Sequence, residues 1–102
     1  MKRELRFRPQ ARRDLRDIWR YSQKTWSSTQ ADRYLAKLNA AINALREKPE
    51  TARASDEISP GLLRRDAERH LIYFRVKADH ILIIRVLHQR MDHAAQLAND
   101  EG

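Results

Sequence analysis

Two apolar runs of the chain, Leu71 to Val76 and Ile81 to Leu87, constrain its fold more than any other stretch. Both are rich in branched and aromatic residues, and a short polar break at residues 77–79 separates them. This composition is typical of two strands joined by a tight hairpin. Because nearly every position in both runs is apolar, the sequence predicts that the pair lies at the centre of a sheet and not at its edge.

Each run contains one arginine, Arg75 or Arg85, which must reach solvent or a partner because an unpaired buried charge is costly. The connecting loop decides which faces of the sheet they occupy. A two- or four-residue loop pairs Val76 with Ile81, whereas a three-residue loop exchanges the faces. The first register sets the following side chains on one face: Tyr73, Arg75, Leu82, Ile84, Val86 and His88. The sequence leaves both registers open.

The residues before the hairpin predict a short strand at 2–8 and two helices, at about 10–25 and 28–48, from the spacing of their apolar residues. Pro9 suits the first turn of a helix, and Pro49 forbids continuation of the second. The short linker makes the helices an antiparallel hairpin. With one more strand at 62–67, the order is β-α-α-β-β-β. We therefore expect an α+β fold with both helices packed on one face of a three-stranded antiparallel meander and the first strand at the sheet edge.

The C-terminal end and the size of the chain complete the domain prediction. After residue 92 the sequence predicts a last helical turn or two, and residues 99–102 are expected to fray. A chain of 102 residues has the size of one domain, which we place at residues 1–98.

The chain is basic, with a formal net charge of +7, and the excess is uneven. Residues 1–20 hold eight cations against three carboxylates, and residues 62–90 hold seven against three. A small basic protein usually meets nucleic acid, a nucleoprotein machine or an acidic protein. The absence of cysteine fits a reducing cytoplasm, and the longest aliphatic run, Ile81 to Ile84, is too short to cross a bilayer. We expect a cytoplasmic protein without a membrane partner.

No spacing in the sequence predicts a metal site or a cofactor. The four histidines do not pair at a metal-ligand spacing, and two glycines cannot form a glycine-rich phosphate loop. His88, at a strand end, has the chemistry of a general base, but the pattern favours a histidine that bonds the backbone there. Trp19 and Trp26 lie on the apolar stripe of the first helix, and the pattern favours packing in the core.

Four stretches, residues 8–11, 14–19, 70–76 and 84–92, together resemble the toxins of the ParE/RelE superfamily. The likeness extends from about Leu5 to Asp92, and the last stretch is the most specific and resembles the ParE branch. The resemblance implies the toxin half of a type II toxin–antitoxin system. It implies inhibition of DNA gyrase by binding, which blocks replication. It also implies neutralisation by a ParD-like antitoxin whose C-terminal segment wraps the toxin.

The RelE branch of the same fold, which cuts messenger RNA on the ribosome, is the alternative. Its members use basic residues on the sheet and often a tyrosine or histidine near the C-terminus. This chain has no tyrosine after Tyr73 and no lysine between residues 49 and 63, which weakens the alternative. His88 as base, with Arg75 or Arg85 as the cation for the phosphate, would be its catalytic residues.

A plain nucleic-acid-binding module is a third open class. The chain has the charge for it but no recognised motif and, beyond Tyr73 and Phe74, no basic strand interleaved with aromatic residues. A steep salt dependence of binding to naked DNA would favour this class, and we expect no sequence-specific binding of nucleic acid.

The predicted sites fall into two groups. The surface for the target combines cations with a methionine: Arg64, Arg65, Arg75, Arg85, His88, Arg90 and Met91. The surface for the antitoxin consists of apolar anchors: Trp19, Trp26, Tyr34, Leu38 and Tyr73. Charge is expected to govern how fast the antitoxin associates, and the buried anchors how long it stays.

Overall fold

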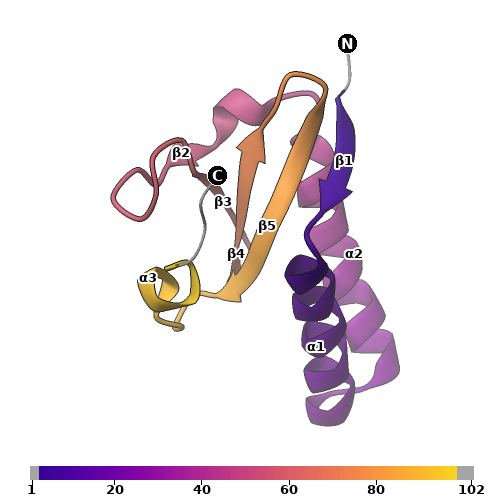
Figure 1. Cartoon of the computed structure of the whole chain (residues 1–102). Coiled ribbons are helices and arrows are strands. Elements are labelled where there is room, and N and C mark those ends of the chain that lie inside the picture. Colours follow the sequence, from indigo (N-terminus) through magenta and orange to yellow (C-terminus); the bar gives the residue numbers. More distant parts are fainter. Residues whose placement is uncertain (1–2, 99–102) are drawn as a thin grey trace.

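The computed structural model of the protein describes residues 3–98, so the predicted fraying of residues 99–102 lies outside the described residues. Figure 1 shows a sheet with two long helices on one side and a short helix near the C-terminus on the other. The elements are β1 (Glu4–Phe7), α1 (Pro9–Thr25), α2 (Ser28–Ala44), a 3-10 turn (Pro49–Thr51), β2 (Arg53–Ala54), β3 (Leu63–Ala67), β4 (His70–Val76), β5 (His80–His88) and α3 (His93–Gln96).

The sheet has the order β1-β5-β4-β3-β2. Strand β1 runs parallel to β5, and the other neighbouring pairs are antiparallel. The predicted α+β order, the central position of the two apolar runs and the edge position of the first strand are confirmed. The two-residue strand β2 was not predicted, because two residues give no readable alternation.

Local signals set the helix boundaries. Pro9 occupies the first turn of α1, and Ser27 caps α2 by accepting a hydrogen bond from the Gln30 backbone N–H at 3.1 Å. Helix α2 ends at Ala44, four residues earlier than the predicted end at Lys48, and the chain continues in turns. Within residues 3–98, no helix has both the length and the apolar character that a membrane span requires.

The β4–β5 hairpin adopts one of the two registers that the sequence left open. Val76 faces Ile81, and the Lys77 N–H donates to the His80 carbonyl at 2.8 Å, which closes the loop. This is the register of an even-numbered loop. Consequently the first part of the predicted face is correct: Tyr73, Arg75, Leu82 and Ile84 point away from the two long helices.

A β-bulge then changes the faces in the second half of β5. Phe74 pairs with Ile83, but Tyr73 pairs with Arg85, so Ile84 is an extra residue without a partner on β4. Beyond the bulge, each side chain of β5 therefore lies on the opposite face from the one that simple alternation predicts. The prediction that Val86 and His88 share a face with Tyr73 is therefore wrong, and both lie on the helix side.

The sheet is covered on both faces, which explains why β4 and β5 are apolar at nearly every position. On one face α1 and α2 bury Leu38, Ile42 and Leu45 against Phe74 and the strands beside it. On the other face a smaller cluster lies under the 55–62 loop and α3: Leu62, Tyr73, Ile84, Leu87 and Leu97. The helix-side core also positions the site described next.

Candidate interaction site

An open groove of about 1300 Å³ lies between the helical hairpin and the end of the sheet where β4 begins and β5 ends. Figure 1 shows the loop end of the hairpin projecting past this end of the sheet. Among residues 3–98, the large apolar side chains that stay exposed are Tyr21 (69%), Trp26 (66%) and Met91 (42%), and all three line this groove. Exposed apolar side chains gathered at one concave surface mark an interaction site.

The charges around the groove favour an acidic partner. Asp14 and Arg85 pair with each other, which leaves an excess of cations on the rim. The lining residues with a formal charge are Arg33, Lys37, Arg69, Arg85 and Arg90 against Asp14, Asp17 and Glu68. A segment that presents carboxylates beside apolar side chains would match both properties of this surface.

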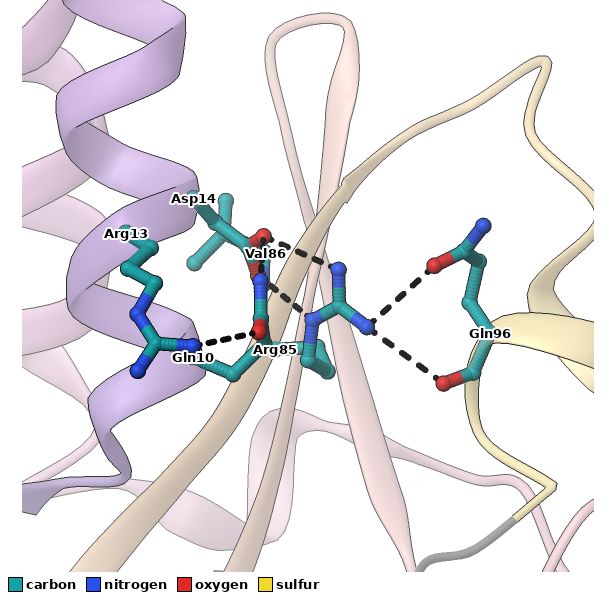
Figure 2. A network of polar contacts seen from close by, with 6 residues as sticks. All are labelled: Gln10, Arg13, Asp14, Arg85, Val86 and Gln96. Carbon is teal, nitrogen blue, oxygen red and sulfur yellow. Dashed lines mark hydrogen bonds and ion pairs between the residues drawn. The ribbon is translucent and has the colours of Figure 1, made fainter.

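One wall of the groove is fixed by a buried ion pair, which Figure 2 shows. The Arg85 guanidinium donates to both carboxylate oxygens of Asp14, at 2.7 Å from Nε and 2.9 Å from Nη2. The same carboxylate accepts the Val86 backbone N–H at 3.0 Å. On its far side, Arg85 Nη1 donates to the backbone and side-chain oxygens of Gln96, both at 3.3 Å. Arg85 thus joins α1, β5 and α3.

Asp14 is a central residue that the sequence predictions missed. It is only 9% exposed, because it lies on the apolar stripe of α1, between Ala11 and Ile18 at helical spacing. A carboxylate on a core-facing stripe needs a buried partner. The position of Asp14, together with the arginine in each apolar run, was the signal available in the sequence.

A pair of histidines forms the floor of the groove beside the turn into β4. The His70 ring is 8% exposed and meets the His88 ring edge-on, with 5.2 Å between centroids. Tyr34 Oη lies 2.7 Å from His70 Nδ1 and accepts the Arg69 backbone N–H at 3.1 Å. The Tyr34 hydroxyl thus joins the turn at Arg69 to the His70 ring.

The surroundings of His70 favour its neutral form. Burial, and then the neighbouring His88, lower the pKa of His70 to about 4, against a small opposing effect of Asp14. Burial also raises the pKa of Tyr34. His88 Nδ1 accepts the Arg90 backbone N–H at 3.1 Å, so it closes a strand end as the sequence pattern favoured.

The predicted target residues do not form one surface. Arg85, His88, Arg90 and Met91 line the groove. Arg64 and Arg65 lie instead at a hollow of about 630 Å³ on the β2–β3 side of the sheet, where Arg64 donates to Glu57 at 3.1 Å.

Arg75 was predicted to lie on the surface for the target, and this prediction is wrong. It is 7% exposed, on the face opposite α1 and α2. Its Nη1 donates to the Pro60 carbonyl and its Nη2 to Ser59 Oγ, both at 2.8 Å. Gly61 follows in a left-handed conformation, with φ +81°, and an added Cβ there would lie 3.1 Å from Arg75 Nη1. Arg75 therefore anchors the 55–62 loop, and its charge is used inside the protein.

The predicted antitoxin anchors divide in the same way. Trp26 and Tyr34 line the groove, whereas Leu38 (0% exposed) and Tyr73 (1%) are core residues, Tyr73 on the far face. Their burial removes Leu38 and Tyr73 from any surface. Trp19 is half-buried and donates from Nε1 to Asp32 at 2.9 Å, which links the two helices.

The expectation that Trp26 packs in the core is wrong. Trp26 caps the C-terminal end of α1, where the hairpin projects beyond the sheet and no strand covers it. Helical spacing gives the direction of a side chain but not whether another element lies opposite.

The comparisons with known proteins agree with this architecture. A protein-family model described as "ParE toxin of type II toxin-antitoxin system, parDE" matches residues 5–93. Toxin ParE1 of Mycobacterium tuberculosis (strain ATCC 25618 / H37Rv) is 39% identical over 82% of this chain and 87% of that protein. Toxin ParE1 of Caulobacter vibrioides is 37% identical over 85% and 90%, and Toxin ParE of Escherichia coli is 33% identical over 88% of each.

Two solved structures show the same fold. The chromosomal ParDE toxin–antitoxin system from P. aeruginosa matches with a TM-score of 0.76 at 19% identity, covering 85% of this chain and 96% of that one. The toxin–antitoxin complex RelBE2 from Mycobacterium tuberculosis matches with a TM-score of 0.67 at 21% identity, covering 86% and 99%. Given the family match over nearly the whole chain and the identities of these relatives, this chain belongs to the ParE family, the toxins of type II toxin–antitoxin systems.

Proposed function

We propose that this toxin inhibits DNA gyrase by binding, without cutting RNA, and that a ParD-like antitoxin neutralises it by occupying the groove. The observation that carries the proposal is the convergence of Tyr21, Trp26 and Met91 on one cation-rimmed groove. The family assignment supports gyrase as the target. The ParE-like ending of the chain contributes Arg90 and Met91 to the rim of the groove.

The proposed antitoxin contact is an acidic, amphipathic segment. Its apolar side chains would cover the three exposed anchors, and its carboxylates would meet the surplus cations on the rim, such as Arg33 and Arg69. Because Arg90 and Met91 would serve both partners, an antitoxin seated in the groove would exclude the target directly.

The ribonuclease alternative has less support from the geometry. In-line cleavage needs a cation available to the phosphate. Arg85 is engaged by Asp14 and Gln96, and Arg75 is buried on the opposite face of the sheet from His88. If His88 acted as the base, neither of the two predicted cations, Arg75 and Arg85, would be available to the phosphate.

The first prediction tests the target. We expect the purified toxin to inhibit gyrase supercoiling and the double variant Arg90→Ala/Met91→Ala to need about tenfold more protein for the same inhibition, because both side chains are exposed at the rim. Circular dichroism checks the fold. The control is Arg53→Ala, an exposed cation at the other side of the sheet. Cleavage of translated messenger RNA that disappears in His88→Ala, with gyrase unaffected, would establish the ribonuclease instead.

The second prediction tests the groove. Replacing Trp26 by alanine removes a large exposed anchor, so the dissociation rate of the antitoxin should rise about tenfold while the association rate changes little. Surface-immobilised toxin and purified antitoxin give both rates. Lys24→Ala is the control, since it lies at the same end of α1 but does not line the groove. An unchanged lifetime of the complex would place Trp26 outside the contact.

A further inference from the structure

The outward side of α1 carries a row of cations that neither the core nor the groove uses. Arg12, Arg16, Arg20 and Lys24 follow one another at four-residue intervals, and Arg13 lies beside them. All five side chains are exposed. Residues four apart lie one above the other along a helix, so these cations form a continuous ridge about 18 Å long at 1.5 Å per residue. We call these five residues the basic row.

The basic row faces away from the groove. At 100° per residue, the core-facing side of α1 is marked by Ala11 and Leu15, and the groove-facing side by Asp14 and Tyr21. The basic row occupies the remaining sector. None of its members lines the groove, so a segment bound in the groove leaves the row accessible.

Little within the protein neutralises the basic row. Arg12 lies 4.8 Å over the Phe7 ring, and Arg13 donates to a neutral glutamine side chain. Arg16 approaches Asp17 at only 4.0 Å, with both side chains more than half exposed. Within residues 3–98, the side chains of Arg20 and Lys24 form no hydrogen bond or ion pair. Like charges four residues apart slightly destabilise a helix, so helix stability does not explain the row.

We propose that the basic row binds the sugar–phosphate backbone of duplex DNA without sequence preference. Its members and the adjacent Gln23 are all polar, so this side of α1 offers no apolar anchor of the kind that sustains a peptide contact. Evenly spaced cations suit a polyanion bound through charge alone. At one phosphate per 3.4 Å of each strand, the row spans about five phosphates.

The biological role of this DNA contact rests on the proposed function, the inhibition of gyrase. A toxin whose target enzyme holds DNA would meet duplex DNA beside that target. The basic row would then contact the DNA while the groove rim contacts the protein. DNA binding by the toxin alone can be measured without gyrase, so failure of this inference and failure of the proposed target are separable.

The experiment measures binding of the whole toxin to a fluorescently labelled 20-base-pair duplex by anisotropy, between about 50 and 200 mM salt. The variant Arg12→Gln/Arg16→Gln/Arg20→Gln removes three cations of the row and keeps good helix formers. The control, Arg6→Gln/Lys48→Gln/Arg53→Gln, removes three exposed cations that belong neither to the row nor to the groove and has the same net charge. Circular dichroism verifies both folds.

We expect the row variant to lose about tenfold or more in affinity, and the slope of log K against log salt to become shallower by about two to three. The control should stay close to the wild type. Equal losses in both triple variants would overturn the proposal, because net charge alone would then explain binding. It is also overturned if the wild type fails to bind at the lowest salt, or if the row variant keeps its DNA affinity and loses antitoxin affinity instead.

Discussion

Replacing Asp14 by alanine is expected to lower the free energy of unfolding by about 3–5 kcal/mol, because it leaves a buried charge without its partner. The Arg85 side chain is 14% exposed, and Asp14 receives two of its N–H groups together with the Val86 backbone N–H. After the change, the guanidinium keeps only the two 3.3 Å contacts to Gln96. Urea unfolding followed by circular dichroism measures the loss.

Two further variants separate charge from position. Asp14→Asn keeps an acceptor for the Val86 N–H but removes the negative charge, so it should lose less than alanine does. Asp17→Ala, one turn along the same helix and exposed, should change stability by less than about 0.5 kcal/mol. If Asp14→Ala costs no more than Asp17→Ala, the ion pair does not hold α1 on the sheet.

The second large effect is a loss of stability in mild acid, which arises from His70. Its pKa is about 4 in the folded protein and 6.5 in its ordinary state, so the unfolded chain takes up the proton first. The contribution of His70 to the stability of the folded protein is complete above pH 6.5 and declines as the pH falls toward 4. By linkage, the free energy of unfolding should be lower by about 2 kcal/mol at pH 5 than at pH 7.

Unfolding in urea at pH 7 and pH 5 tests this expectation when wild type and His70→Asn are compared. Asparagine retains an acceptor near the position of Nδ1 but does not titrate in this range. The variant should therefore lose about 2 kcal/mol less than the wild type between the two pH values. An identical pH dependence would show that His70 does not bind the protons that lower the stability.

The sequence by itself determined the fold class and the order of the elements. Two apolar runs required a central hairpin, and helical spacing with Pro9, Ser27 and Pro49 delimited the helices approximately. These features are local: each follows from the chemistry of a few consecutive residues. The resemblance to the ParE/RelE superfamily is likewise carried by four short stretches of consecutive residues.

The tertiary structure alone decided which side chains form the site. The bulge at Ile84 moved His88 to the helix side, and the face of a side chain after a bulge cannot be inferred from simple alternation. Asp14 and Arg85 are 71 residues apart, and Arg75 meets a loop that the sequence marked only as irregular. The exposure of Trp26 depends on where the sheet ends. Periodicity gives each side chain a direction, but whether that direction leads to a partner, a core or solvent is fixed only when distant elements pack together.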